Sequence, residues 1–176
     1  GTQSIMALYF NDRFGFSALV IGMIITVQGV IMSVNQMVGL KRFWLRRFKE
    51  PDLVLFMLLA FTISYFLMGM NFATLFFVGI LIGVFAQSVL RAVFTSQVLG
   101  LAEPHVKGEA MGILTSVLSL GMVVGPLFTG PVYTYKINFP FFVSSILMLF
   151  AFGIIYQHRK KLERLKLDEN VQVNVI

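Results

Sequence analysis

The sequence predicts an all-α protein, a bundle of helices that crosses a membrane several times. Three observations lead to this fold class. Of the 176 residues, 57% are hydrophobic and only 12% are charged, whereas soluble domains are about 25% charged. The hydrophobic residues form long unbroken runs, and the charged residues stand in short clusters between those runs. This composition excludes a disordered chain and an ordinary soluble enzyme.

Five runs are long enough to cross the roughly 30 Å hydrocarbon core as helices, which takes about 20 residues each. The runs are too long and too uniform for the short alternating strands of a membrane barrel. Five full spans are therefore predicted, at about residues 18–40, 53–70, 73–97, 110–133 and 139–157.

The start of the chain is too short to span, and it is predicted to be the end of a sixth helix. Because the chain begins with Gly1, we expect it to be a piece of a longer protein. A polar cluster at 11–15 is predicted to form the first turn, and Pro51 stands where a helix can begin. The bundle is expected to occupy residues 1–158, and a basic tail is expected at 159–176.

The cationic residues are divided unequally between the two sides of the predicted membrane. Successive helices alternate in direction, so the loops fall into two sets. One set and the tail carry eleven cations, whereas the other set carries only Arg13 and Lys136. The positive-inside rule places the larger set, and with it the C-terminus, in the cytoplasm. We therefore expect the partner of this basic chain to be a lipid bilayer and not a nucleic acid. The eleven are Lys41, Arg42, Arg46, Arg47, Lys49, Lys107, Arg159, Lys160, Lys161, Arg164 and Lys166.

Two predicted spans carry polar stripes, and these supply the substrate-binding candidates. Gln28 and Asn35 lie in the first span, and Gln87 and Arg91 lie one helical turn apart on one face of the third. Amides within a membrane either line a water-filled cavity or form hydrogen bonds between helices, and both interpretations stay open. Arg91 either faces such a cavity or extends toward the cytoplasmic surface.

The remaining spans are interpreted from their small and apolar residues. The second and fifth spans are mostly apolar and are predicted to be peripheral and lipid-facing. The GxxxG pattern of Gly79 and Gly83 is interpreted as a helix-packing motif and not as a nucleotide site. None of the eight acidic residues lies in mid-span, and no catalytic set or metal-ligand spacing is present. The sequence therefore predicts no enzyme activity, metal or cofactor.

The fourth span contains a distinctive series of glycines and prolines. Gly112 and Gly130 share one helix face, and Gly121 and Gly125 lie roughly opposite. Small residues let helices approach closely, so this span is predicted to pack tightly on two sides. Pro126 has no N–H to donate, so a kink is expected near it. These five residues are the candidates for helix packing and conformational change.

The spacing of this series resembles the antiporter motif of the major facilitator superfamily, with Thr129 where the first of two final glycines would stand. The resemblance extends over nearly the whole chain and implies the C-terminal half of a twelve-span transporter, from the end of span seven to span twelve. In that family the third helix of each triplet is peripheral, which agrees with the apolar second and fifth spans.

The resemblance implies a secondary transporter that works by alternating access, most like the drug:proton antiporters. Its partners would be a small-molecule substrate and an N-terminal six-helix half. Gln28, Asn35, Gln87 and Arg91 would hold polar parts of the substrate. A facilitator or nutrient symporter of the same fold stays open as an alternative, as does a membrane module that binds a partner without transport.

Overall fold

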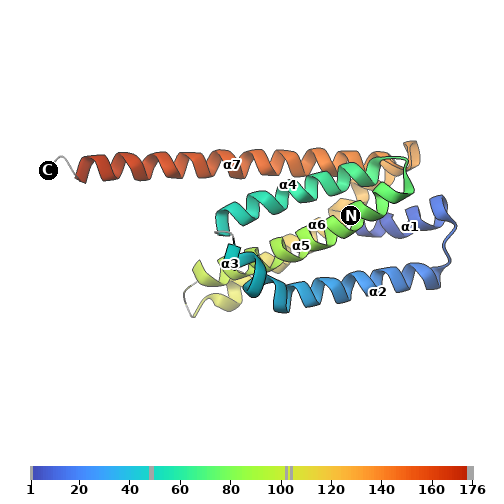
Figure 1. The fold of residues 1–176 in the computed structure, drawn as a ribbon, viewed down its shortest axis with the longest axis horizontal. Helices are drawn as coiled ribbons and strands as arrows, with labels where there is room; N and C mark the ends of the chain where they lie inside the picture. Colours follow the sequence, from blue (N-terminus) through green and yellow to red (C-terminus); the bar gives the residue numbers. More distant parts are fainter. Residues whose placement is uncertain (1, 48–49, 102, 104, 174–176) are drawn as a thin grey trace.

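Every regular element is a helix in the described part of the computed structural model, and the long helices run back and forth along one axis (Figure 1). Five stretches are long and apolar enough to cross a membrane: Ala18–Gly39, Glu50–Gly69, Ala73–Gly100, Lys107–Tyr135 and Phe139–Lys161. They match the predicted spans to within four residues at each end, so the all-α prediction is confirmed. The structure describes residues 2–47, 50–101, 103 and 105–173, without the side chains of 2–4, 40, 41, 45, 101 and 162–173.

The first turn is shorter than the sequence predicted. Helix α1 (Thr2–Phe14) continues through most of the polar cluster at 11–15 and is followed by Gly15. Gly15 has a φ of 64°, a left-handed conformation that glycine adopts without strain. Ser17 then caps helix α2 (Ala18–Val34), because its hydroxyl accepts a hydrogen bond from the Val20 N–H at 3.5 Å. The turn is therefore set by one glycine and one cap.

The first predicted span changes its winding at Asn35. A π-helix, η1 (Asn35–Trp44), continues α2 and leads into the short helix α3 (Leu45–Arg47). A Cβ added to Gly39 would lie 2.3 Å from the side-chain oxygen of Asn35, so only glycine leaves room for that amide. A π-helix often marks a functional position. Here the π-helix begins at Asn35, a polar residue that is buried in the bundle.

Helices α4 (Glu50–Gly69) and α5 (Ala73–Leu101) pack closely through the GxxxG pattern. The Ser64 hydroxyl donates to the carbonyl of Gly79 at 2.7 Å. A Cβ on Gly79 would lie 2.8 Å from the Ser64 carbonyl oxygen, and one on Gly83 would lie 2.5 Å from the Ser64 hydroxyl. The packing interpretation of this pattern is confirmed, because the glycines let the two backbones meet.

Helix α4 also corrects the prediction that the second span faces lipid. Its residues Leu53, Met57 and Ser64 are fully enclosed, because α4 lies between α5 and α7. Only its opposite face is open, where Phe56 and Phe66 are about half exposed. The polar residues Thr62 and Ser64 of α4 are therefore buried between helices.

Helix α7 (Phe139–Val173) is longer than the predicted fifth span and projects beyond the bundle (Figure 1). The predicted start of the tail at residue 159 falls inside this continuous helix. Here Arg159 forms an ion pair with Asp52 at the beginning of α4. This pair joins α4 to α7 at the end of the bundle where most cations are found.

The buried residues form two clusters. The first contains aromatic rings of α1, α5 and α7 together with non-aromatic apolar side chains. Tyr9 stacks on Phe76 with ring centroids 4.6 Å apart, and it meets Phe141 edge-on at 5.1 Å. The second cluster lies mainly between α4 and α5, around Leu53 and Val89. Together they hold α1, α4, α5 and α7 as one packed unit.

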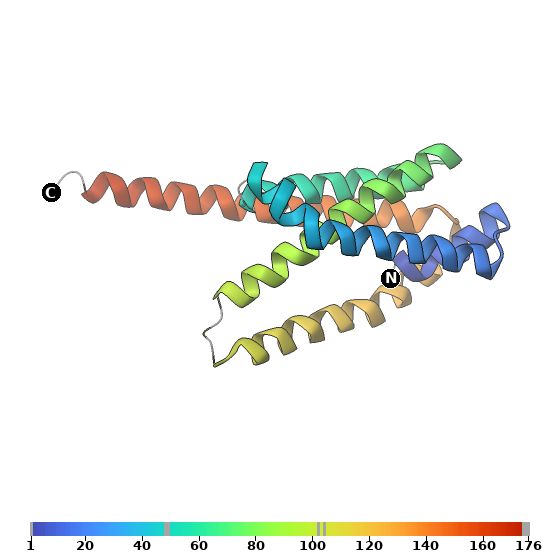
Figure 2. The same ribbon diagram turned by 60° about the horizontal axis from the view of Figure 1, so that its bottom comes forward.

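Helices α2 and α6 (Lys107–Tyr135) contribute little to these clusters. Ile21 is the only buried residue of α2, and none of the residues of α6 is buried. Figure 2 shows α6 nearest to α5 at the loop that joins them and separating from it toward the other end of α6. A Cβ on Gly112, Gly121 or Gly130 would meet no atom within 4 Å. The close neighbours predicted for this span are therefore not found among the described segments.

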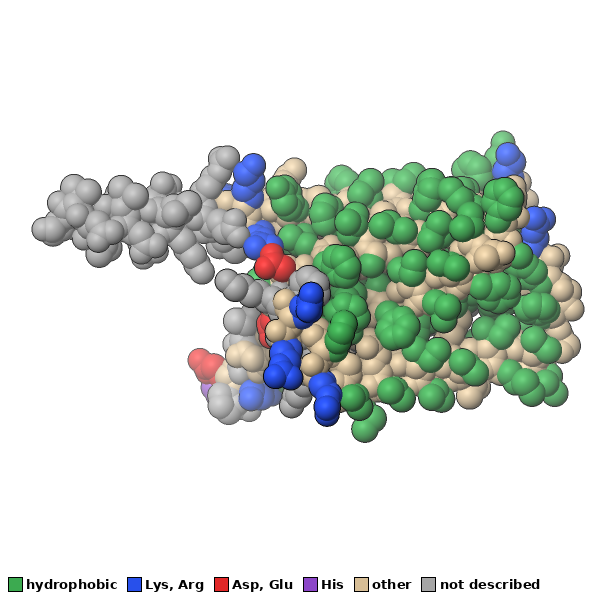
Figure 3. Space-filling model, viewed as in Figure 1, with side chains coloured by type: hydrophobic (Ala, Val, Ile, Leu, Met, Phe, Trp, Pro, Cys, Tyr) green, Lys and Arg blue, Asp and Glu red, His purple; other side chains and the backbone are tan. Residues whose placement is uncertain are grey.

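Lysine and arginine side chains gather at the two ends of the molecule, with an apolar band between them (Figure 3). Arg13 and Lys136 lie at the turns of one end, where α1 meets α2 and α6 meets α7. Most of the other described cations lie at the opposite end. This division agrees with the two sets of loops predicted from the sequence.

A hydrogen bond between side chains holds the end of α6 against α1. The Tyr133 hydroxyl donates to the Asp12 carboxylate at 2.6 Å. We expect Tyr133→Phe to reduce the free energy of unfolding by about 0.5–1.5 kcal/mol, the usual contribution of one hydrogen bond. Thermal unfolding of the purified protein measures this. Tyr135→Phe is the matched control because its ring is 80% exposed. Equal midpoints for the two variants would contradict the prediction.

Candidate functional site: an amide-lined cavity inside the bundle

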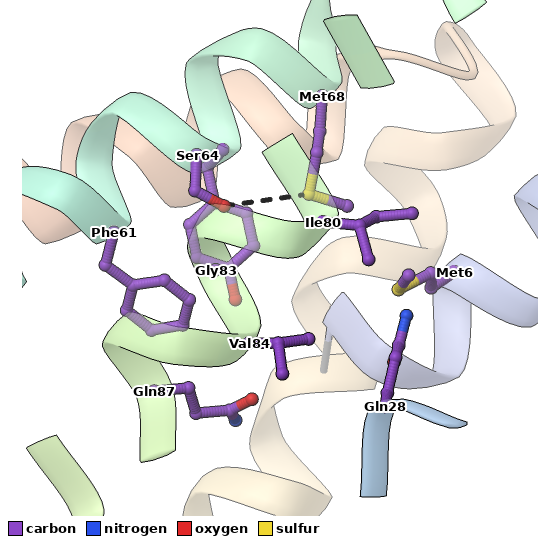
Figure 4. A pocket seen from close by; sticks show the side chains of 10 residues that line it. Met6, Gln28, Phe61, Ser64, Met68, Ile80, Gly83, Val84 and Gln87 are labelled. Atoms are coloured by element: carbon purple, nitrogen blue, oxygen red, sulfur yellow. Dashed lines mark hydrogen bonds between the residues drawn. The ribbon is translucent and has the colours of Figure 1, made fainter. Parts of the chain in front are cut away.

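Four helices line a small cavity of about 40 Å³ within the bundle (Figure 4). Gln28 from α2 and Gln87 from α5 line it, and both point into the space between the helices. Apolar side chains and two residues with hydroxyl groups, Ser64 and Tyr65, complete the wall. The other lining residues are Met6, Phe61, Ser64, Tyr65, Met68, Ile80, Gly83 and Val84.

The amide of Gln28 is the most unusual group in this wall. Its Nε2 atom is enclosed and has no hydrogen-bond partner among the described residues. Figure 4 shows this nitrogen directed toward Met6. An enclosed donor without an acceptor is destabilising, by about 1–3 kcal/mol in typical proteins. Gln28 is therefore positioned to donate a hydrogen bond to a molecule that occupies the cavity.

Ser64 fixes the opposite wall. Its hydroxyl hydrogen is engaged by the Gly79 carbonyl at 2.7 Å, and the Met68 sulfur lies at 4.0 Å from the same oxygen. The oxygen still has lone pairs to accept a hydrogen bond. The hydrogen bond that holds α4 against α5 thus also places the Ser64 oxygen at the cavity wall.

The structure places Asn35 outside this cavity. Both polar atoms of its amide form hydrogen bonds. Asn35 Nδ2 donates to the hydroxyl of Ser88 on α5, and Asn35 Oδ1 accepts from the indole N–H of Trp44 at 3.1 Å. The side chain is buried. Of the two interpretations left open by the sequence, this geometry matches a hydrogen bond between helices.

Replacing Asn35 by alanine is expected to destabilise the protein by about 1–3 kcal/mol, because the Ser88 hydroxyl and the Trp44 N–H each lose the hydrogen bond that they form with Asn35. A denaturant titration followed by circular dichroism gives the change. Gln36→Ala is the control, since the neighbouring amide lies outside this network. A stability loss of the same size in both variants would show that the network is not the cause.

Arg91 follows Gln87 by one turn of α5, but it does not line the cavity. Its side chain is exposed, and its backbone carbonyl accepts a hydrogen bond from the Thr95 hydroxyl at 2.8 Å. The guanidinium is thus available on the surface of α5. The structure therefore brings Gln28 and Gln87 together, and it leaves Asn35 and Arg91 at separate positions.

Sequence reasoning missed two contributors to the cavity. Met6 belongs to the segment treated as the end of a helix, and Ser64 belongs to the span predicted to face lipid. The available signal was the spacing of Ser64 and Met68, one turn apart on one face of an otherwise apolar helix. That signal is weak because methionine is equally common in an ordinary core.

Long apolar helices, polar groups enclosed between them and cations at both ends define an integral membrane protein of the helical-bundle class. The chain belongs to the Major Facilitator Superfamily, whose family model matches residues 1–173.

Two curated relatives come from Bacillus subtilis (strain 168). Multidrug resistance protein 1 is 27% identical over 152 residues, which are 86% of this chain and 38% of the relative. Multidrug resistance protein 2 is 30% identical over 110 residues, which are 61% of this chain and 27% of the relative. The chain therefore spans well under half the length of these relatives. No solved structure matches it significantly.

Proposed function

We propose that this chain works as part of a secondary transporter that moves small organic solutes across a membrane by alternating access, in exchange for protons. Membership of the superfamily over nearly the whole chain carries the proposal, and the names of the two multidrug resistance relatives favour organic solutes. In such transporters two helical repeats rock about a site near the middle of the membrane.

The substrate path is proposed to run past the polar residues of α2 and α5. Gln28 and Gln87 supply neutral hydrogen-bonding groups, and Arg91 supplies a cation on the same side of α5 as Gln87. Asn35 is proposed to position these groups by fixing α2 against α5. The cavity of about 40 Å³ is far smaller than the roughly 300 Å³ of a small-molecule pocket. The main substrate volume therefore belongs beside the cavity and not within it.

The exposed faces of α2 and α6 are proposed to meet an N-terminal six-helix half. These helices bury the fewest residues of the candidate spans, and three glycines of α6 have no neighbour within 4 Å. Because small residues serve close helix contacts in membranes, such a face suits another helix better than lipid. Gly125 and Pro126 lie midway along α6 and would shape this contact.

Gly121→Leu tests that contact in the full-length protein. The larger side chain is expected to abolish transport while leaving helix content unchanged, because it separates the two halves without disturbing the described contacts. Gly153→Leu on α7 is the control, since a Cβ there also meets nothing within 4 Å. Solute uptake into vesicles measures both variants. Full transport by Gly121→Leu would overturn the proposed contact.

Transport in exchange for protons is tested with the full-length protein in sealed vesicles. An imposed proton gradient should drive accumulation of an amphipathic organic dye, and collapse of the gradient should stop it. A facilitator or nutrient symporter is the second candidate, favoured by the absence of any mid-span carboxylate in this sequence. Equal dye movement with and without the gradient would favour the facilitator.

The end of the bundle that carries most of the cations is proposed to lie in the cytoplasm, together with the C-terminus. A single cysteine introduced near residue 105 and another near 136 would report on the two ends. This chain contains no cysteine, so its own residues give no background. A membrane-impermeant maleimide applied outside intact cells should label only the second position.

A further inference from the structure

The cavity between α1, α2, α4 and α5 contains a buried amide nitrogen that lacks a hydrogen-bond partner, next to a small space. Gln28 Nε2 is enclosed and unpartnered among the described residues, and the amide of Gln87 borders the same space. Buried polar groups are nearly always satisfied, by protein or by ordered water. The Gln28 donor therefore requires a partner in the space that the cavity offers.

The size and the chemistry of the wall limit what this partner can be. One water molecule requires about 10–15 Å³ in this measure of volume, and the cavity offers about 40 Å³. That is room for a few water molecules and no more. No charged side chain lines the cavity among the described residues, so an ion would lack a counter-charge. Phe61, Ile80 and Val84 form the apolar remainder of the wall.

We propose that this cavity is a hydration site, in which two or three ordered water molecules connect the amides of Gln28 and Gln87. The waters accept a hydrogen bond from Gln28 Nε2, and the Ser64 oxygen offers them a further acceptor. The site goes beyond the proposed transport function and does not depend on it.

The hydration site gives α2 a second polar attachment to the bundle. Asn35 already bonds directly to Ser88 of α5, and Gln28 lies seven residues earlier on the same face of α2. Ile21 is the only residue of α2 that is otherwise buried. The waters therefore hold the middle of a helix that makes few apolar contacts.

Radiolytic footprinting of the full-length protein in nanodiscs tests the site. Hydroxyl radicals formed from bound water oxidise the side chains that touch it. Met68 lines the cavity, whereas Met57 on the same helix belongs to the apolar cluster between α4 and α5. Their exposed fractions are 4% and 2%, so bulk radicals reach neither. We expect Met68 to be oxidised several-fold more than Met57.

Two variants connect that signal to the amides. Gln28→Leu and Gln87→Leu should each reduce the oxidation of Met68 to the level of Met57, and the double variant should reduce it no further because both side chains hold the same waters. Gln36→Leu, outside the cavity, should leave it unchanged. Equal and low oxidation of Met68 and Met57 in the unmodified protein would overturn the proposal, as would full oxidation of Met68 in Gln28→Leu.

Discussion

A Gly79→Ala variant is expected to lose about 1–3 kcal/mol of its free energy of unfolding through overpacking alone. The new Cβ would lie 2.8 Å from the Ser64 carbonyl oxygen and 2.8 Å from Cγ of Met68. The carbonyl belongs to the backbone and cannot rotate away, so α4 must move off α5. That movement also weakens the hydrogen bond from Ser64 to the Gly79 carbonyl, worth about 0.6 kcal/mol on average in a membrane.

Gly100→Ala is the matched control for this variant. It makes the same substitution on the same helix, but at a position where a Cβ meets nothing within 4 Å. It should be neutral, or stabilising by up to about 1 kcal/mol through helix propensity. Unfolding in a denaturing detergent, followed by circular dichroism, compares the two. Identical midpoints would show that α4 and α5 approach less closely than the structure indicates.

Arg91→Ala in the full-length protein is expected to reduce the transport rate by about tenfold or more, equivalent to about 1.4 kcal/mol. The guanidinium is exposed one turn beyond Gln87, where we propose that polar parts of the substrate pass. Membrane insertion and expression should stay normal, because Arg91 makes no contact that holds the cavity together. Dye accumulation per molecule of inserted protein is the measurement.

The alternative for Arg91 is an anchoring role at the membrane surface. Arg91→Lys keeps the charge and the reach, and Arg42→Ala removes an exposed cation at the cation-rich end of the bundle. A substrate-contacting role requires that Arg42→Ala keeps full transport. If Arg91→Ala also keeps full transport, Arg91 is an anchor and the proposed role fails.

The sequence predicted the number and position of the spans closely, because long apolar runs depend only on hydrophobic transfer and helix geometry. It also predicted the packing role of Gly79 and Gly83, because residues four positions apart lie on the same face of a helix. It predicted a turn at 11–15, which the structure shortens to the residues around Gly15, and it did not predict the π-helix from Asn35. The π-helix begins at Asn35, whose partner Ser88 lies far away in the sequence.

The candidate site was predicted only in part. Gln28 and Gln87 were named because amides are rare in lipid, and the structure brings them to one cavity. Ser64 was missed because the face that α4 buries depends on its position between α5 and α7. The sequence also did not indicate that Asn35 would meet Ser88 and Trp44 and not the cavity, since contacts between distant elements set that outcome.

The indole that completes the Asn35 network belongs to Trp44, the single tryptophan of the chain. Its ring meets that of Phe43 edge-on, with centroids 5.0 Å apart. The fluorescence of this residue therefore senses the junction between α2 and α5 without any attached dye. A shift in its emission wavelength would report, in real time, whether the hydrogen bond between the Trp44 indole and the Asn35 amide is kept when the bundle changes conformation.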